Sequence, residues 1–312
     1  MRARKNLKKV KMKNSYVVGK EIVSLRLDKA LTLFDSNNSR EFYSYQIKEG
    51  NVKVNGEIKS PSYKVKEDDV IDTTFINKVL DESLKPYELE LDIVYEDDDL
   101  LIINKPRGLV VHPGSGHHDD TLVNALIYNK VSLSNSNGMY RVGIVHRIDK
   151  DTSGLLLVAK NDFTHERVAN QLKDHSMHRE YIALVEGIIE EDQGKIVGSI
   201  GRNKQNRLKM AIDAINGKNA TTYFEVVKRY KKYTLIKCRL ETGRTHQIRV
   251  HLSSISHPIV GDGLYGGGCS VFNKGQLLHA YKLTFVHPRT KKEMSFERDI
   301  PLEFNEVLET LK

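Results

Sequence analysis

VGIVHRIDKDTSGLLLVAK, residues 142–160, places a polar turn between two runs of Val, Ile and Leu. Apolar runs of this length, bounded by turn residues, are typical of buried strands, so we expect strands at Gly143–Ile148 and Leu155–Ala159. The turn would hold Asp149 at a strand end. Two interpretations stay open at this point: Asp149 is a reactive group on a rigid support, or it accepts turn N–H groups and pairs with Arg147.

The rest of the apolar pattern predicts many strands and few helices. Further strands are expected at Asp92–Tyr95, Leu100–Asn104, Tyr181–Val185, Thr222–Val227, Tyr233–Leu240 and Leu283–His287. Helices are expected at Thr121–Lys130, Thr164–Lys173 and Thr245–Ser254. An irregular alternation of this kind favours an α+β fold with a large mixed sheet over a doubly wound fold.

A separate small domain is expected over residues 16–75. Apolar residues recur twice at helical spacing, after which Val52 and Val54 alternate into Asn55-Gly56, a strong hairpin signal. The pattern therefore predicts a helix–helix–hairpin module. Around it we expect a basic tail over residues 1–15, a linker over 76–86 and a second domain over 87–312.

Composition narrows the class of protein. The 312 residues carry a net charge of +8, which points to a polyanionic partner, with nucleic acid as the first candidate. The two cysteines, Cys238 and Cys269, lack CxxC partners, so neither a disulfide framework nor a zinc site is expected, and the cytoplasm fits. No window is apolar and long enough to span a membrane, and no secretory signal is present. We expect a monomer.

A second cluster, ETGRTHQIRVH at residues 241–251, ends a strand and opens a helix. His246 and Arg249 are three residues apart and so share a helix face. An Arg on this helix near Asp149 would form a directional, charge-assisted pair. A structural ion pair or a phosphate contact is the alternative, and the spacing alone favours that alternative.

Two more clusters carry polar residues on expected strands and loops. HREY, residues 178–181, places Tyr181 at a strand edge, where packing is the commoner role and catalysis the rarer one. NKPRGLVVHPGSG, residues 104–116, is either a turn-forming passage or a loop that lines a substrate site. No HExxH, P-loop or GxGxxG motif is present in the required context, so neither a metal nor a nucleotide cofactor is expected.

These motifs together resemble a known family. HRIDKDTSGLLLVAK closely resembles the motif of the RluA/RluD family of RNA pseudouridine synthases, in which the Asp of HRLDxxTSG is catalytic. ETGRTHQIRVH, HREY, NKPRGLVVHPG and HPIVGDGLYG fall in the family's order, and RLDKAL…SR…IKEGNVKVNG resembles the S4 RNA-binding module. The resemblance implies the pseudouridine synthase fold, with a large, mostly antiparallel mixed sheet. Ile148 stands where Leu is commoner, a volume-conserving change.

The resemblance also implies residue roles. Asp149 matches the catalytic carboxylate, Tyr181 the active-site tyrosine, Arg249 the basic residue paired with the Asp, and Arg147 the arginine that enters the vacated helix stack. RNA contacts are assigned to His146 and, in the S4-like module, to Arg26, Lys29, Arg40, Lys48, Lys53 and Asn55. The implied substrate is structured RNA, with 23S ribosomal RNA of the large subunit as the expected target.

The chemistry of that reaction fits one carboxylate without a cofactor. Uridine becomes pseudouridine when the N1–C1′ bond breaks and C5 joins C1′, so the base must be kept in place and water kept out. A hydrolytic glycosidase commonly uses two carboxylates, one of which activates water or attacks. Asp149 attacks C1′ or C6 or removes the C2′ proton, and each role needs its ionised form, which Arg249 would stabilise.

Two other classes of function compete with this assignment. A non-catalytic RNA-binding or ribosome-assembly factor would use the S4-like module alone, and a modification assay separates it from an enzyme. A nucleoside hydrolase would use Asp149 and Asp262 as a carboxylate pair and would release free uracil.

Overall fold

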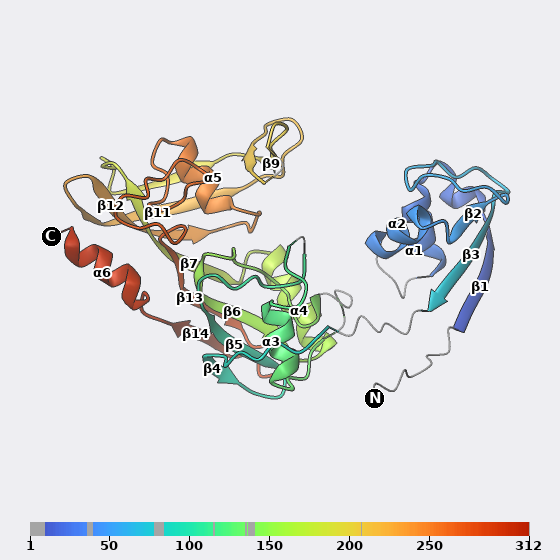
Figure 1. The fold of residues 1–312 in the computed structure, drawn as a ribbon, viewed down its shortest axis with the longest axis horizontal. Coiled ribbons are helices and arrows are strands. Elements are labelled where there is room, and N and C mark those ends of the chain that lie inside the picture. The colour runs from blue at the N-terminus through green and yellow to red at the C-terminus, as the bar shows by residue number, and fades with distance from the viewer. Residues whose placement is uncertain are drawn as a thin grey trace, which may run out of the picture. The chain divides into compact units, whose positions relative to one another are not determined.

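The computed structural model describes residues 10–35, 40–77, 84–114, 116–134, 136, 141–206 and 208–311. The chain forms two compact units, an N-terminal unit of residues Met1–Ser83 and a C-terminal unit of residues Leu84–Lys312, both drawn in Figure 1. Of the expected linker, Ile76 and Asn77 belong to a strand, and residues 78–83 lie outside the described part. The described helices include none with the length and apolar character that crossing a membrane requires.

The N-terminal unit packs short helices against a three-stranded sheet of order β1-β3-β2. Its elements are β1 (Val10–Val17), η1 (Lys20–Ile22), α1 (Leu27–Phe34), α2 (Arg40–Lys48), β2 (Val52–Val54) and β3 (Val70–Asn77). Leu27, Leu31, Tyr43 and Ile47 from the helices meet Ile71 of the sheet in one buried cluster. Helical spacing of these apolar residues thus buries one face of each helix.

Two expectations for this unit are corrected. The basic tail was expected to run to residue 15, but β1 starts at Val10 and pairs antiparallel with β3 up to Val17. Alternating lysines obscured this strand in the sequence. The Asn55-Gly56 turn is present, with φ of +52° and +82°. The expected hairpin is not formed with the residues directly after this turn, because β2 pairs mainly with the more distant β3.

The C-terminal unit is built on a nine-stranded mixed sheet. In hydrogen-bonded order its strands are β4 (Ile93–Glu96), β5 (Leu100–Lys105), β6 (Ser153–Ala159), β13 (Leu278–Val286), β7 (His178–Glu186), β12 (Tyr233–Leu240), β11 (Thr221–Arg229) and β8 (Gln193–Val197), with β14 (Glu293–Glu297) against β13. The other elements are the strand pair β9 (Ile200–Arg202) and β10 (Met210–Ile212), and helices α3 (Leu122–Tyr128), α4 (Asp162–Lys173), α5 (Gln247–Ser254) and α6 (Leu302–Thr310). The predicted α+β class and mostly antiparallel mixed sheet are confirmed.

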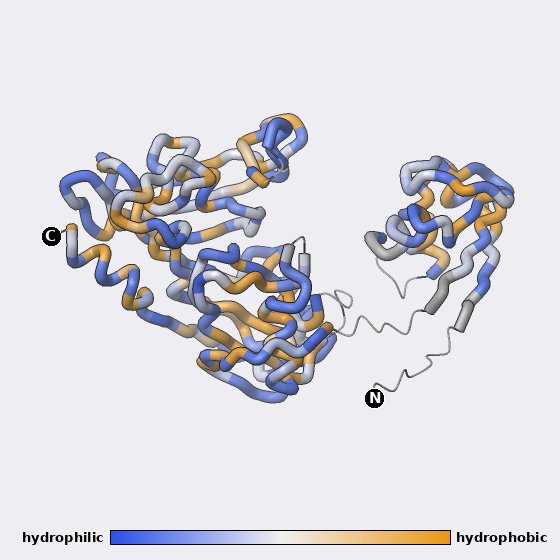
Figure 2. Tube along the Cα trace, viewed as in Figure 1, coloured by the Kyte–Doolittle hydropathy of each residue, from blue (hydrophilic) through white to orange (hydrophobic). Residues whose placement is uncertain are grey.

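Strand β6 is an interior strand of this sheet, between β5 and β13. It pairs antiparallel with β5 and, through two residue pairs, parallel with β13, which makes the sheet mixed. Leu156 and Val158 enter one buried apolar cluster and Leu155 and Leu157 another, so both faces of the strand are covered. A strand covered on both faces reads as a continuous apolar run, which is why LLLVA stood out in the sequence and why apolar colour follows the central strands in Figure 2.

The expected strand at Gly143–Ile148 is wrong. The segment makes one isolated bridge, between Ile144 and Val158, and Gly143 has a φ of +71°. The backbone N–H of Leu157 donates instead to Nε2 of His146 at 3.0 Å, so a side chain takes the place of a neighbouring strand. Asp149 consequently lies in the loop that enters β6 rather than at the end of a preceding strand. The sequence prediction also omitted β8, β9, β10, β14 and α6.

Candidate active site

A cleft of ≈ 580 Å³ opens over the C-terminal unit's sheet. Its walls include residues of the loop 145–149, the C-terminal part of α4, the start of β7 and the segment 242–249 that leads into α5. Four of the predicted residues, Asp149, Arg147, Tyr181 and Arg249, line it together with His146. The fold therefore gathers three clusters that lie up to 100 residues apart in the chain.

Asp149 is largely enclosed, with 16% of its side chain exposed. Arg249 Nη1 donates to Asp149 Oδ2 at 3.1 Å, which is the pair that the sequence predicted. On the other side, His246 Nε2 lies 3.9 Å from Asp149 Oδ1. A buried carboxylate needs a partner of opposite charge, and the guanidinium of Arg249 supplies it.

Arg249 also contacts Asp262 and Tyr265, which fix its guanidinium. Its Nε and Nη2 donate to the two oxygens of Asp262 at 2.7 and 2.8 Å, and its guanidinium carbon lies 4.9 Å from the Tyr265 ring centroid. Although burial acts to lower the pKa of Arg249, its bonds to Asp262 and the charge of Asp149 raise that pKa overall. Only the remaining Nη1 is directed to Asp149, so the guanidinium is fixed in orientation as well as charge.

This arrangement removes the basis for a two-carboxylate hydrolase. Both oxygens of Asp262 accept from Arg249, its side chain is 1% exposed, and it is not part of the cleft wall. A second carboxylate that activates water must reach the substrate. Asp262 instead orients Arg249, and its role as one of a hydrolytic pair is not supported.

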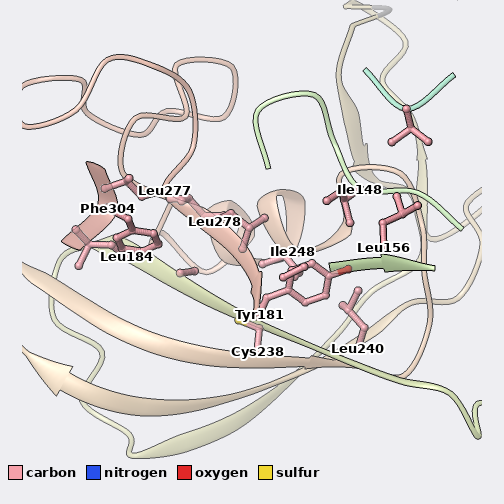
Figure 3. Packing of buried hydrophobic residues seen from close by; sticks show 14 of the residues in the cluster. Ile148, Leu156, Tyr181, Leu184, Cys238, Leu240, Ile248, Leu277, Leu278 and Phe304 are labelled. Carbon is pink, nitrogen blue, oxygen red and sulfur yellow. The ribbon is translucent and has the colours of Figure 1, made fainter. Parts of the chain in front are cut away.

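Tyr181 extends from β7 into the cleft wall and is 5% exposed. Figure 3 shows its ring among apolar side chains, with Ile248 on one side, and with the hydroxyl at the end away from Cys238. Burial raises the pKa of Tyr181, and the nearby charges of Arg179 and Asp149 act in opposite directions. The phenol is therefore protonated near neutral pH.

Arg147 and His146 are neighbours in sequence but have different surroundings. Arg147 is exposed at the cleft, and its Nη1 lies 3.2 Å from His112 Nε2. His146 is 8% exposed and holds the N–H of Leu157. Arg147 is thus free to reach outward, whereas His146 contributes to the cleft wall.

The basic residues that are expected to contact RNA in the N-terminal unit form two groups. Arg26 and Arg40 both donate to the buried carboxylate of Asp28, at 3.0 and 3.1 Å, while the rest of each side chain stays accessible. The other expected cations are exposed at Lys29, Lys48 and Lys53. The cations therefore remain available to a phosphate backbone.

Asn55 differs from the other residues expected to contact RNA. Its Nδ2 donates to Asp69 Oδ1, and its Oδ1 accepts from the N–H of Val70, both at 2.8 Å. The amide therefore closes the turn against β3. A contact from Asn55 to RNA stays a prediction.

Among the described residues, one group has the side chains and spacing of a metal site. Candidate ligand atoms of Asp97, Asp99 and His287 lie within 4.8 Å of one another. His287 Nε2 is 2.9 Å from Asp97 Oδ2, and Arg289 donates to both oxygens of Asp99 at 2.6 Å. These contacts make the group an ion-pair network whose oxygens already have partners.

Sequence reasoning missed several residues around Asp149. Tyr265 lies 2.8 Å from His246 Nδ1 and accepts the N–H of Met210, and neither contact has a local sequence signal. His246 was expected inside a helix starting at Thr245, but it is the N-cap of α5 with a φ of +56°. The GDGLYG stretch was the available signal, because it places Asp262 and Tyr265 three residues apart.

Comparison with known proteins shows the family of this chain. Residues 99–254 match the family model described as RNA pseudouridylate synthase. The chain belongs to that family. Residues 25–71 match the S4 domain, an RNA-binding module, so the protein is an RluA-type RNA pseudouridine synthase with an N-terminal S4 domain. The alternative of a non-catalytic RNA-binding factor is not supported.

Relatives with pseudouridine synthase names match this chain along almost its whole length. An uncharacterized RNA pseudouridine synthase, YlyB of Bacillus subtilis, is 46% identical over 93% of this chain and 95% of its own length. Ribosomal large subunit pseudouridine synthase D of Zymomonas mobilis is 42% identical over 90% of this chain and 92% of its own length. The structure of human RNA pseudouridylate synthase domain containing 1 has a TM-score of 0.55 at 25% identity, over 73% of this chain and 97% of that one.

Proposed function

We propose that this enzyme converts specific uridines of large-subunit ribosomal RNA to pseudouridine, with Asp149 as its catalytic carboxylate. The observation that carries the catalytic assignment is the enclosed Asp149–Arg249 pair in the cleft, with Arg249 fixed by Asp262. Such a carboxylate is oriented by its partner and largely enclosed, as cleavage of a glycosidic bond without hydrolysis requires.

In this proposal the target uridine leaves its stack and enters the cleft. Unstacking costs on the order of a few kcal/mol. Arg147, exposed beside the cleft, fills the vacancy by stacking and phosphate contact and recovers part of that cost. The S4 domain adds basic contacts outside the cleft, so that docking of a structured RNA brings one uridine to Asp149.

Asp149 then acts at the sugar or at the base, and the base stays bound while N1–C1′ is exchanged for C5–C1′. The final step removes a proton from C5. Tyr181 is buried in the same wall and carries a protonated hydroxyl, so it accepts this proton only as its own hydroxyl proton passes to solvent. A positioned group of this kind contributes about 10²–10⁴-fold.

The choice of ribosomal RNA rests on relatives. Proteins named ribosomal large subunit pseudouridine synthase D, from Zymomonas mobilis and Neisseria meningitidis, are 42% and 41% identical to this chain over at least 90% of it. This target places the proposed activity in the cytoplasm. Mapping pseudouridine across total RNA, with and without the gene, is the test. Loss of pseudouridine only from other RNAs would refute the ribosomal assignment.

The catalytic assignment is tested by Asp149→Asn. The amide keeps the shape of the side chain but has no charge for Arg249 and no carboxylate for catalysis, so we expect normal folding, retained RNA binding and no product. Tritium release from RNA labelled at C5 of uridine measures turnover directly. Turnover in the variant above the level without enzyme would rule out the mechanism.

A further inference from the structure

Arg179 is a second cation of the cleft, and it has no carboxylate partner among the described residues. Arg179, on β7, lines the cleft and is 7% exposed. Within the described part of the chain its guanidinium has no ion pair, and its buried Nε has no hydrogen-bond partner. Arg249 and Arg107, which are also buried or nearly so, have carboxylate partners in Asp262 and Glu303.

An unpaired buried guanidinium is costly. Arginine stays protonated in proteins, so it cannot escape the cost by losing its charge. The effective penalty for a buried ion is several kcal/mol unless an opposite charge and hydrogen bonds compensate. Burial accordingly lowers the pKa of Arg179, although this pKa starts far above neutrality. None of the described residues supplies a compensating carboxylate, so an anion bound in the cleft would lower this cost.

The backbone is shaped around this guanidinium. A Cβ atom at Gly243 would lie 2.5 Å from Arg179 Nη1, so a side chain at this position would displace the guanidinium. Gly243 belongs to the same cleft wall and stands between Thr242 and Arg244. The absence of a side chain at this position lets the turn approach the charged group.

His146 provides a second unpartnered donor beside it. Because Nε2 of His146 accepts the N–H of Leu157, the ring proton is on Nδ1, and this buried atom has no partner. Burial and the charge of Arg179 lower the pKa of His146 to about 3, so the ring stays neutral and Nδ1–H stays a donor. Both unpartnered N–H groups are buried, and both residues line the same cleft.

The rest of the cleft wall is suited to an anion. Lys173 and Arg244 also line it, and among the described lining residues Asp149 is the sole carboxylate. Asp149 is already paired with Arg249. The positive charge of Arg179, Lys173 and Arg244 is therefore not balanced within the cleft.

We infer that Arg179 and His146 form a phosphate subsite, which binds a phosphodiester of the RNA strand beside the uridine held at Asp149. A uracil carbonyl would satisfy the hydrogen bonds but not the charge, whereas RNA carries its formal negative charge on phosphate. The inference rests on the proposed function for its RNA ligand, while the subsite itself is a binding element that leaves the chemistry at Asp149 unchanged.

The first test measures how the unpaired charge of Arg179 affects the stability of the enzyme without RNA. Arg179→Met keeps most of the volume and removes the unpaired charge, so in full-length enzyme without RNA we expect the Tm of the C-terminal unit to rise by about 2 °C or more. The matched control is Arg229→Met, which removes a guanidinium that has Asp192 as its partner. We expect no rise in Tm for the control. A fall in Tm for Arg179→Met would overturn the inference, because it would show a structural role.

Ligand and rate measurements complete the test. Sodium phosphate, compared with sodium chloride at equal ionic strength, should raise the Tm of the wild-type enzyme and of Arg229→Met but not of Arg179→Met. With total RNA as substrate, we expect Arg179→Met to raise KM about tenfold or more while kcat changes little. Equal phosphate effects in all three proteins would refute the subsite. The subsite would also be refuted if uridine, and not phosphate, raised the Tm in a way that depends on Arg179.

Discussion

Arg249 lies between two carboxylates and binds them unequally. It donates two hydrogen bonds to Asp262, which is almost fully buried, and one to Asp149, which opens on the cleft. The bidentate contact fixes the plane of the guanidinium, and the single contact then fixes where the carboxylate of Asp149 points. One arginine thereby supplies both charge balance and orientation for Asp149, the proposed catalytic group.

We expect Arg249→Ala to lower kcat by at least about 100-fold while RNA binding is retained, because two enclosed carboxylates lose their shared cation. Tritium release gives kcat, and a filter-binding assay gives affinity. Since the alanine variant also destabilises the fold, Arg249→Lys serves as the control: it restores charge without the planar fork and should recover folding more than rate. A wild-type rate in either variant would return Arg249 to a purely structural role.

At the scale of single residues, the resemblance to the family predicted the pair of Asp149 and Arg249, whereas the spacing alone favoured a structural ion pair or a phosphate contact for Arg249. The sequence did not predict that Asp262 holds Arg249, because a buried aspartate in a Gly-rich loop has no local signature of its partner. The unpaired state of Arg179 was equally hidden. Only tertiary structure shows that a charged residue lacks a counter-ion.

Among the elements, the loop before β6 depends on the end of β5. Lys105 is fully buried, and its Nζ donates to the carbonyls of Pro106, Leu109 and Lys150 at 2.7, 2.8 and 3.0 Å. Lys150 follows Asp149 directly in the chain. The amino group of Lys105 therefore ties the loop that carries Asp149 to the loop after β5.

Lys105→Met should destabilise the C-terminal unit by about 3 kcal/mol, because three buried carbonyls lose their donor. Urea unfolding followed by circular dichroism measures this loss. The control is Lys231→Met at an exposed position, which should stay within about 0.5 kcal/mol of the wild type. If the two variants were equally stable, the three hydrogen bonds would not anchor the loop.

Element prediction succeeded where burial gives a clear pattern and failed where side chains replace backbone pairing. The apolar run of β6 and the strand β12 were predicted at or near their observed bounds. Gly143–Ile148 has the same composition as a strand, yet the imidazole of His146 takes the hydrogen bond that a paired strand would take. The short strands β9 and β10 carry too few residues to show a period.

At the scale of the whole molecule, buried neutral histidines make stability depend on pH. Burial lowers the pKa of His146 to about 3 and that of His279 to about 4. Unfolded histidine binds a proton near pH 6.5, so the stability from each residue is complete above this pH and is lost as pH falls toward the folded pKa.

We therefore expect unfolding free energy to fall between pH 7.5 and 5 by about 2 kcal/mol for each of these histidines. Urea unfolding at the two pH values measures the loss. His279→Gln lowers stability at both pH values, but it should reduce the difference in unfolding free energy between the two pH values by about 2 kcal/mol. An unchanged difference would show that His279 does not contribute to the acid sensitivity.

The two units divide the work of the molecule, and truncation separates their contributions. The C-terminal unit, residues Leu84–Lys312, contains the whole cleft and its own buried core, so removal of residues 1–83 should leave catalysis at Asp149 possible. The same truncation removes the exposed Lys29, Lys48 and Lys53 together with the S4 domain.

We expect weaker RNA binding in the truncated enzyme, with a salt dependence reduced by about 0.9 units of log–log slope for each duplex phosphate that the S4 domain no longer neutralises. Filter binding over a range of salt concentrations measures this slope, and tritium release with total RNA measures the remaining activity. The matched control is the full-length chain with Lys29, Lys48 and Lys53 changed to Ser, which keeps the S4 fold and should show a similar reduction in slope. If truncation left both affinity and slope unchanged, the cations of the cleft, Arg179 among them, would account for RNA binding on their own, and the S4 domain would need another role.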